Sequence, residues 1–143
     1  MNVSRSELGK LTGFILIGLF ILLGFRYVLK AYFKINAKKL DKNSQFYKIL
    51  VKVMSLNKTL HPYVGYTAIL FIALHSFIQT GWNLYLDSET ITGIITGLLF
   101  VFNVFGGFVG ENIFKTKRPK WWIWVHRSLT ILIGISILIH INQ

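Results

Sequence analysis

Histidine occurs four times in this 143-residue chain, and the four residues form two pairs with the same spacing. His61 and His75 bound one apolar stretch, His126 and His140 bound another, and each pair is fourteen residues apart. Imidazole nitrogens bind iron, zinc and copper and also carry protons. In an α-helix fourteen residues rise about 21 Å and make nearly four turns, so both histidines of a pair lie on one face.

The stretches that carry these histidines are two of four apolar blocks, at about 11–33, 61–82, 91–113 and 121–141. Each block is close to the roughly 20 residues that a helix needs to cross about 30 Å of hydrocarbon. Membrane strands would alternate apolar and polar residues, whereas 14–25 and 131–139 are apolar on every face. The sequence therefore predicts an all-α membrane protein, a four-transmembrane-helix up-down bundle that forms a single domain over 1–143.

Residues 34–60, between the first two blocks, are predicted to form a basic cytoplasmic linker. Apolar residues at helical spacing from Ser44 to Asn57 predict an amphipathic helix on the membrane surface. Its lipid-facing residues would be Phe46, Leu50, Val53 and Met54. A cationic stripe with four-residue spacing precedes it, on a helix that is expected to leave the membrane: Arg26, Lys30, Lys34, Lys38 and Lys42. The stripe favours acidic lipid headgroups, and an acidic cytoplasmic protein is the alternative partner.

The net charge of +11 is distributed by side of the membrane. In an up-down chain the basic loops before the second and fourth spans share one side, which then carries fourteen of the sixteen Lys and Arg. The positive-inside rule predicts that this side is cytoplasmic and that both termini lie outside. In a prokaryote the plasma membrane would be the location. Membrane topology accounts for the positive charge, so the sequence does not predict nucleic-acid binding. No cleavable signal peptide is apparent. Interfacial aromatic belts are expected from Trp121, Trp122 and Trp124 on one face and from Trp82 and Tyr85 on the other.

Haem is the ligand that the histidine spacing favours. The second and fourth spans run in the same direction, so His61 is expected at the level of His126 and His75 at the level of His140. Zinc takes four protein ligands, or three and water, and neither level has an obvious carboxylate or cysteine. Haem iron takes two axial ligands, and its porphyrin fills apolar space between helices. Because the chain has no cysteine, iron–sulfur clusters and covalent haem are excluded. Two bis-histidine haem b groups are therefore predicted, one at each level.

Small and cationic residues complete the predicted sites. Gly65 and Gly134 would let a macrocycle or a neighbouring helix approach closely, and Gly93 and Gly107 repeat the fourteen-residue spacing on the third span. Ordinary helix packing explains these glycines equally well. The propionates of the cytoplasmic-side haem would find Arg127, with Lys58, Lys120 and Asn57 at a similar depth, although Lys58 and Lys120 also suit interface anchoring.

The segments HPYVGYTAILFIALHSF and WVHRSLTILIGISILIH resemble the two haem-binding helices of the ferric reductase-like transmembrane domain. Paired histidines on parallel helices also occur in the cytochrome b subunit of quinol–cytochrome c reductases. The resemblance covers about residues 60–142 and depends mainly on histidine spacing. It implies that His61 and His126 ligate the cytoplasmic-side haem iron and that His75 and His140 ligate the outer one. The chain departs from that family in having four spans and no flavin or nicotinamide domain.

These features predict a dihaem b-type cytochrome, an oxidoreductase or the electron-transfer subunit of one. It would carry single electrons between a cytoplasmic flavoprotein or ferredoxin, or a membrane quinol, and an external acceptor. Quinone is thus a further candidate cofactor. One alternative is a haem-binding anchor or scaffold subunit of a larger respiratory or reductase complex. A histidine-based metal or proton transporter is a weaker alternative, because it predicts acidic residues within the spans and none precedes Glu111 there.

Overall fold

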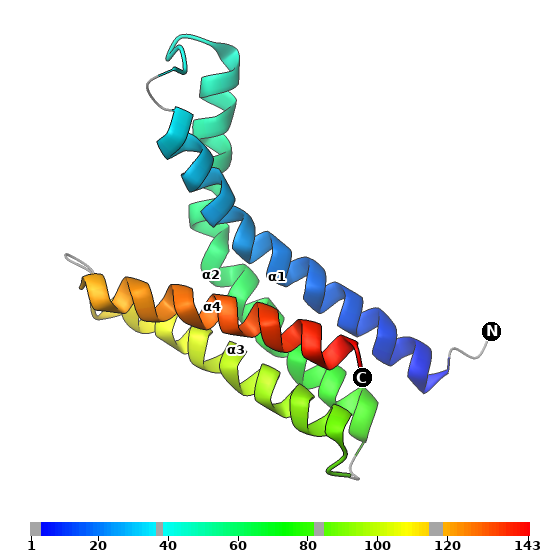
Figure 1. Cartoon of the computed structure of the whole chain (residues 1–143). Coiled ribbons are helices and arrows are strands. Elements are labelled where there is room, and N and C mark those ends of the chain that lie inside the picture. The colour runs from blue at the N-terminus through cyan, green and yellow to red at the C-terminus, as the bar shows by residue number, and fades with distance from the viewer. Residues whose placement is uncertain (1–3, 37–38, 82–84, 115–118) are drawn as a thin grey trace.

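The computed structural model describes residues 4–36, 39–81, 85–114 and 119–143. Four α-helices account for most of them: α1 (Arg5–Asn36), α2 (Gln45–Thr80), α3 (Ser88–Asn112) and α4 (Lys120–Ile141). All four are long and apolar enough to cross a membrane. Consecutive helices run antiparallel, with α1 packed along α2 and α3 packed along α4 (Figure 1). The predicted all-α fold, with four helices long and apolar enough to span a membrane, is confirmed.

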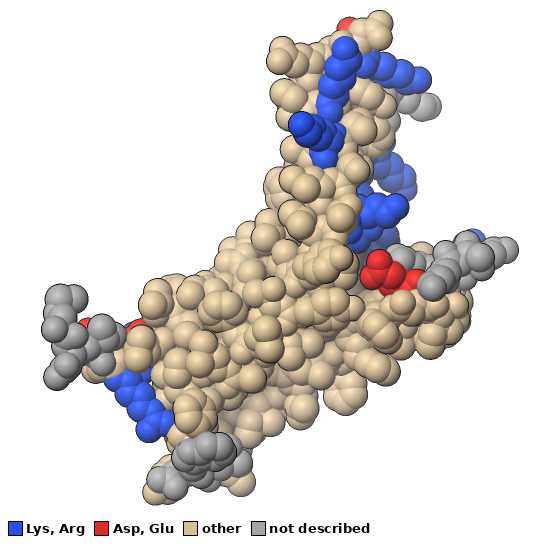
Figure 2. Space-filling view, turned by 180° about the vertical axis from the view of Figure 1, so that it is seen from behind, with Lys and Arg blue, Asp and Glu red and all other residues tan. Residues whose placement is uncertain are grey.

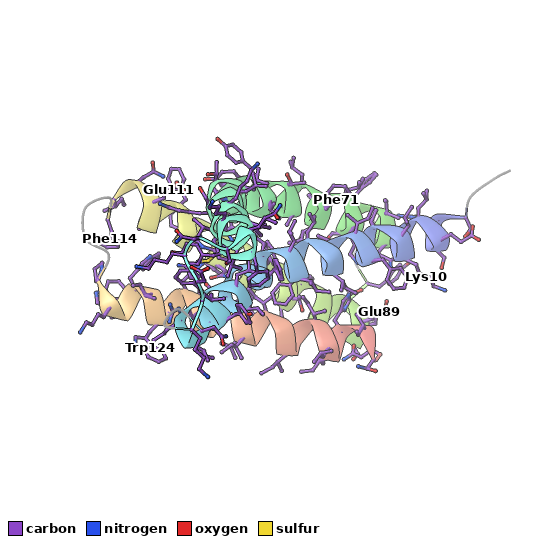
Figure 3. The ribbon with its side chains drawn as sticks, turned by 90° about the horizontal axis from the view of Figure 1, so that it is seen from above. Lys10, Phe71, Glu89, Glu111, Phe114 and Trp124 are labelled. Carbon is purple, nitrogen blue, oxygen red and sulfur yellow. The ribbon has the colours of Figure 1, made fainter. Side chains whose placement is uncertain are left out.

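The surface of the bundle has the character expected of a protein in lipid. Large apolar side chains are exposed on every helix, for example Phe14 (71%), Leu70 (71%), Phe102 (62%) and Leu138 (60%). Water would oppose such exposure, but hydrocarbon does not. Figure 3 shows Phe71 and Trp124 pointing away from the bundle, with Glu111 and Phe114 toward one end and Lys10 and Glu89 toward the other.

Polar residues define where three of the helices begin. Ser4 and Glu7 form a reciprocal capping box at α1: the Glu7 amide donates to Ser4 Oγ (3.2 Å), and the Ser4 amide donates to Glu7 Oε2 (2.8 Å). Ser44 accepts the Tyr47 amide at the start of α2 (3.2 Å), and Asp87 accepts the Thr90 amide at the start of α3 (2.8 Å). These side chains satisfy amide groups that the first helical turn leaves without partners.

The core of the bundle is a small apolar cluster halfway along its length. Ala68, Phe100 and Ile133 are 0%, 6% and 0% exposed and come from α2, α3 and α4, and α1 adds Leu16, Leu19, Phe20 and Leu23. Ala68 and Ile133 each lie seven residues from both histidines of their helix. Seven residues are nearly two turns, about 10 Å of rise, so this cluster lies midway between the two histidine levels. We call it the central cluster.

One predicted feature is wrong in its boundaries. Residues 45–57 are helical, as predicted, but they are not a separate helix and residues 45–60 are not a linker, because α2 runs without interruption from Gln45 to Thr80. The first part of α2 packs against the end of α1, with ring contacts Tyr32–Phe46 and Phe33–Tyr47 at 6.5 and 5.9 Å. Leu50, predicted to face lipid, is buried in the structure. Both helices are longer than a membrane span requires: α1 has 32 residues and α2 has 36, which correspond to about 48 and 54 Å, against about 30 Å of hydrocarbon. Their ends therefore continue beyond the membrane core and pack against each other.

The two overlong ends lie side by side as a pair of helical segments, residues 26–36 and 45–60, which we call the arm. In Figure 1 the arm turns away from α3 and α4. Lys and Arg side chains gather along it, while most of the visible bundle surface is uncharged (Figure 2). The predicted cationic stripe is shorter than expected, because α1 ends at Asn36 and Lys42 lies in the turn before Ser44. Lys38 lies outside the described residues.

Pro62 gives a local reason for the change of direction in α2. It is the proline inside this helix, where its ring lacks an amide donor and crowds the carbonyl four residues earlier, at Lys58. The bend therefore falls directly beside His61, at the junction of the arm and the bundle.

The aromatic residues at the start of α4 divide into two kinds. Trp121 and Trp124 are exposed (59% and 68%), as an interfacial belt requires. Trp122 instead lies against α3, where its ring would come within 3.2 Å of a β-carbon added at Gly106. Trp122 is thus a packing residue and departs from the predicted belt. Trp82, predicted for the opposite belt, lies outside the described residues, and Tyr85 is exposed.

Replacing Ile133 tests the central cluster. Ile133→Ala removes a fully buried side chain and should lower the free energy of unfolding by about 2–5 kcal/mol. Ile135→Ala, a change of the same size on the same helix at a side chain that is 51% exposed, should have a much smaller effect. Denaturation of both variants in detergent measures the difference, and equal losses would contradict a core at this position.

Candidate functional site

The four histidines form two opposed pairs, one toward each end of the bundle. The ring centroids of His61 and His126 are 6.4 Å apart, and those of His75 and His140 are also 6.4 Å apart. Within each pair the ring planes are nearly perpendicular, at 75° and 89°. The pairing across α2 and α4 at two levels is the one that the spacing predicts. We call His61–His126 the arm-side pair and His75–His140 the far pair.

The hydrogen bonds of His75 identify its tautomer. Its Nδ1 lies 3.1 Å from the carbonyl oxygen of Gly9 and 3.1 Å from Oγ1 of Thr12. A carbonyl oxygen can only accept, so Nδ1 must carry the proton and donate it. The Nε2 atom then keeps its lone pair and is available as a ligand.

Thr92 is the partner of His140. The Thr92 hydroxyl lies 3.2 Å from His140 Nδ1, and it also lies within hydrogen-bond distance of the Ser88 and Glu89 carbonyls (3.0 Å each). When its single proton goes to one of these carbonyls, its oxygen accepts from Nδ1–H of His140. His140 then has the same tautomer as His75, with a free lone pair on Nε2.

Glycines on α1 and α3 face three of the four imidazoles. A β-carbon at Gly93 would lie 3.1 Å from Cε1 of His140, at Gly107 3.6 Å from Cε1 of His126, and at Gly13 3.4 Å from Cε1 of His75. The pair Gly93 and Gly107 repeats the fourteen-residue spacing of the histidines on a third helix. Glycine at these positions leaves space beside the rings that any side chain would reduce.

The arm-side pair opens into a cavity of about 240 Å³ bounded by all four helices. Its apolar wall includes Phe20, Gly65, Phe100, Val104 and Gly107. Its polar lining holds four cationic residues, Arg26, Lys30, Lys58 and Arg127, together with Glu111. The Arg127 guanidinium also lies 5.8 Å from the centroid of the Tyr27 ring. The cavity thus combines an apolar interior with an excess of positive charge, which suits a flat apolar group bearing carboxylates.

The sequence-predicted site residues occupy different parts of this arrangement. Arg127 and Gly65 line the arm-side cavity with His61 and His126. Gly134 does not face a histidine: a β-carbon there would meet the Phe20 ring at 3.6 Å, so it allows α1 and α4 to approach beside the central cluster. Lys120 is not among the residues that line the cavity.

Sequence reasoning missed the residues that α1 contributes. Thr12 and Gly13 contact the far pair, and Tyr27 lines the arm-side cavity. Gly13, Phe20 and Tyr27 follow one another at seven residues, in step with His61, Ala68 and His75 on α2. That shared seven-residue spacing could have indicated that this face of α1 packs against the histidine face of α2, but α1 itself contains no histidine.

The dimensions of the pairs can be compared with those of a metal ligated from two sides. A metal–imidazole bond is about 2 Å and a ring nitrogen lies about 1 Å from its centroid, so imidazoles on opposite sides of one metal have centroids about 6 Å apart. The observed 6.4 Å fits this arrangement. Ligands at tetrahedral angles would lie closer together. Among the described residues, no group of three or more His, Cys, Asp or Glu is placed to hold a metal ion. The arrangement of the two pairs therefore fits a metal held by two histidines, as haem iron is.

No protein-family model matches the chain, and neither a curated protein nor a solved structure shows significant similarity to it.

The tautomers of the far pair can be measured directly. Nitrogen-15 NMR of the histidine-labelled protein in detergent, without added haem, should show protonated Nδ1 and unprotonated Nε2 for His75 and His140. Thr92→Val, which removes the partner of His140, should change the His140 signals and leave those of His75 unchanged. A proton on Nε2 of His75 would contradict the hydrogen bond to Gly9.

Proposed function

We propose that the protein is a dihaem b-type cytochrome that carries single electrons across a membrane. The observation that carries this proposal is the 6.4 Å separation of the imidazole centroids, found at two levels. When bound, each haem would supply an iron that accepts and releases one electron. The rest of the proposal concerns what the protein's own residues do.

One histidine from α2 and one from α4 would hold each iron. At the far pair, the Gly9 carbonyl and the Thr12 and Thr92 hydroxyls fix the ring orientations and the Nδ1 protons. Such outer partners typically change metal affinity by about 10–100-fold when they are removed. At the arm-side pair, Gly65 and Gly107 leave room for the macrocycle, and Arg127, Arg26 and Lys58 supply positive charge for propionates. Fixed cations also favour the reduced form of a nearby iron centre.

The orientation in the membrane belongs to the same proposal. Most of the described Lys and Arg lie on the arm or at the arm side of the bundle, which the positive-inside rule assigns to the cytoplasm. The electron donor would then be a cytoplasmic flavoprotein or ferredoxin, or a membrane quinol, and the acceptor would lie outside. A scaffold subunit that binds haem without turnover is distinguished by its lack of reaction with small diffusible acceptors.

A pyridine haemochrome assay tests the proposal. The full chain, purified in detergent from cells with adequate haem supply, should contain two haem b per polypeptide with a low-spin reduced spectrum. His75→Ala and His126→Ala should each retain one haem, because they disrupt different pairs. The proposal fails if the chain binds no haem, or if haem content is the same in wild type and in variants of all four histidines.

Gly93 allows the far site to be disrupted without changing a histidine. A β-carbon at this position lies 3.1 Å from His140 Cε1, so Gly93→Val should displace the ring and reduce haem content from two per chain to about one. Gly18→Val is the matched control, because nothing lies within 4 Å of a β-carbon there, and it should retain both haems. Equal haem content in the two variants would indicate that α3 does not border the far site.

A further inference from the structure

A second cavity, of about 160 Å³, lies between α1 and α2 beside the arm-side pair. It is a groove on the outer surface of these two helices, bounded by Leu22 and Phe25 of α1 and by Val53, Leu56 and Leu60 of α2. These five side chains are all partly exposed, between 37% and 57%. In a membrane this surface faces lipid, near the junction of the bundle and the arm.

The groove is apolar except for two residues one helical turn apart on α2, Asn57 and His61. Asn57 Oδ1 and His61 Nδ1 are both buried, and neither has a hydrogen-bond partner in the part of the chain that the structure describes. Residues four apart on a helix share a face, so the two atoms lie on the same side of α2. Buried polar atoms normally have partners. Both residues line the groove, and His61 lines the arm-side cavity as well, so a ligand in the groove would supply partners that the described residues do not.

The chemistry of the two atoms restricts that ligand. Asn57 Oδ1 can only accept a hydrogen bond. If His61 keeps Nε2 unprotonated, as His75 of the far pair does, then its Nδ1 carries a proton and donates. A hydroxyl group offers both functions, since its oxygen can accept from His61 and its proton can be donated to Asn57. The surrounding side chains require that this hydroxyl belong to an apolar molecule that enters from the membrane.

We propose that the groove binds the hydroxyl-bearing ring of a membrane quinol, with the ring against Leu22 and Phe25 and the isoprenoid tail in lipid. A phospholipid headgroup is a poorer fit, because its charge needs cations and no Lys or Arg lines the groove among the described residues. This inference rests on the proposed function and makes it more specific, because the quinol would contact a residue that holds the arm-side iron. Its oxidation to the quinone would release two electrons, passed one at a time to the haem iron, and two protons, released to water at the membrane surface.

The test uses heptylhydroxyquinoline N-oxide, a fluorescent mimic of the quinol ring, titrated into the purified haem-loaded chain. Wild type should quench the probe saturably, with one site per chain. Asn57→Leu removes the acceptor and Leu22→Trp fills the groove from α1, so each should weaken binding at least tenfold. Leu70→Trp is the matched control, because Leu70 is equally apolar, 71% exposed and outside the groove, and it should bind as wild type does.

Haem content, measured on the same samples, separates the two proposals. Two haems without saturable probe binding would overturn the quinol site and leave the cytochrome proposal standing. Absence of haem would overturn the cytochrome proposal, and titration of the haem-free chain and of the same two variants would still decide whether the groove binds the probe. Loss of binding in Leu22→Trp but not in Asn57→Leu would overturn the polar contact, and with it the assignment of a quinol. Equal binding in all variants would overturn the groove as the site.

Discussion

The packing of Ala68, Phe100 and Ile133 at the middle of the bundle is the constraint on which both histidine pairs depend. These residues are the most deeply buried apolar side chains of their helices, and each lies seven positions from the residues that form the two levels. With their contact fixed, the period of the α-helix places the flanking residues on the same inner face, two turns away in each direction. A shift of one helix by a single residue would turn its histidines away from their partners.

The two levels are built with different degrees of constraint. At the far pair, threonine hydroxyls and a backbone carbonyl fix both imidazoles, and the helix ends are held as well: Arg5 donates to the carbonyls of Ile78 and Phe77, at the end of α2. At the arm-side pair, His61 lies beside the bend at Pro62 and its Nδ1 has no partner among the described residues. The histidines of the far pair are thus held by hydrogen bonds, whereas the arm-side pair borders a cavity, a groove and the arm.

Much of this arrangement was predictable from the sequence, and the reasons are physical. Runs such as residues 131–139 have no polar face, so the membrane-spanning helices could be predicted. Residues fourteen apart lie on one face of a helix, so the pairing of the histidines at two levels could be predicted as well. The arm did not follow, because the polar residues of 45–60 suggested a separate surface helix, and local composition cannot show that α2 continues through Pro62. Thr12 was equally hidden, because a threonine near a helix end is common, and only packing of α1 on α2 reveals that it contacts His75.

The closest packing in the chain occurs within two sequential hairpins, α1 with α2 and α3 with α4. Each histidine pair takes one ring from the first hairpin and one from the second. During synthesis the first hairpin can enter the membrane complete, but neither site exists until the second has entered and docked against it. A ligand held between α2 and α4 would therefore join the two halves, because anything that binds only the docked form stabilises it. Supply of that ligand would then govern how much of the newly made protein persists in the assembled state, and how much remains as two loosely associated hairpins exposed to membrane proteases.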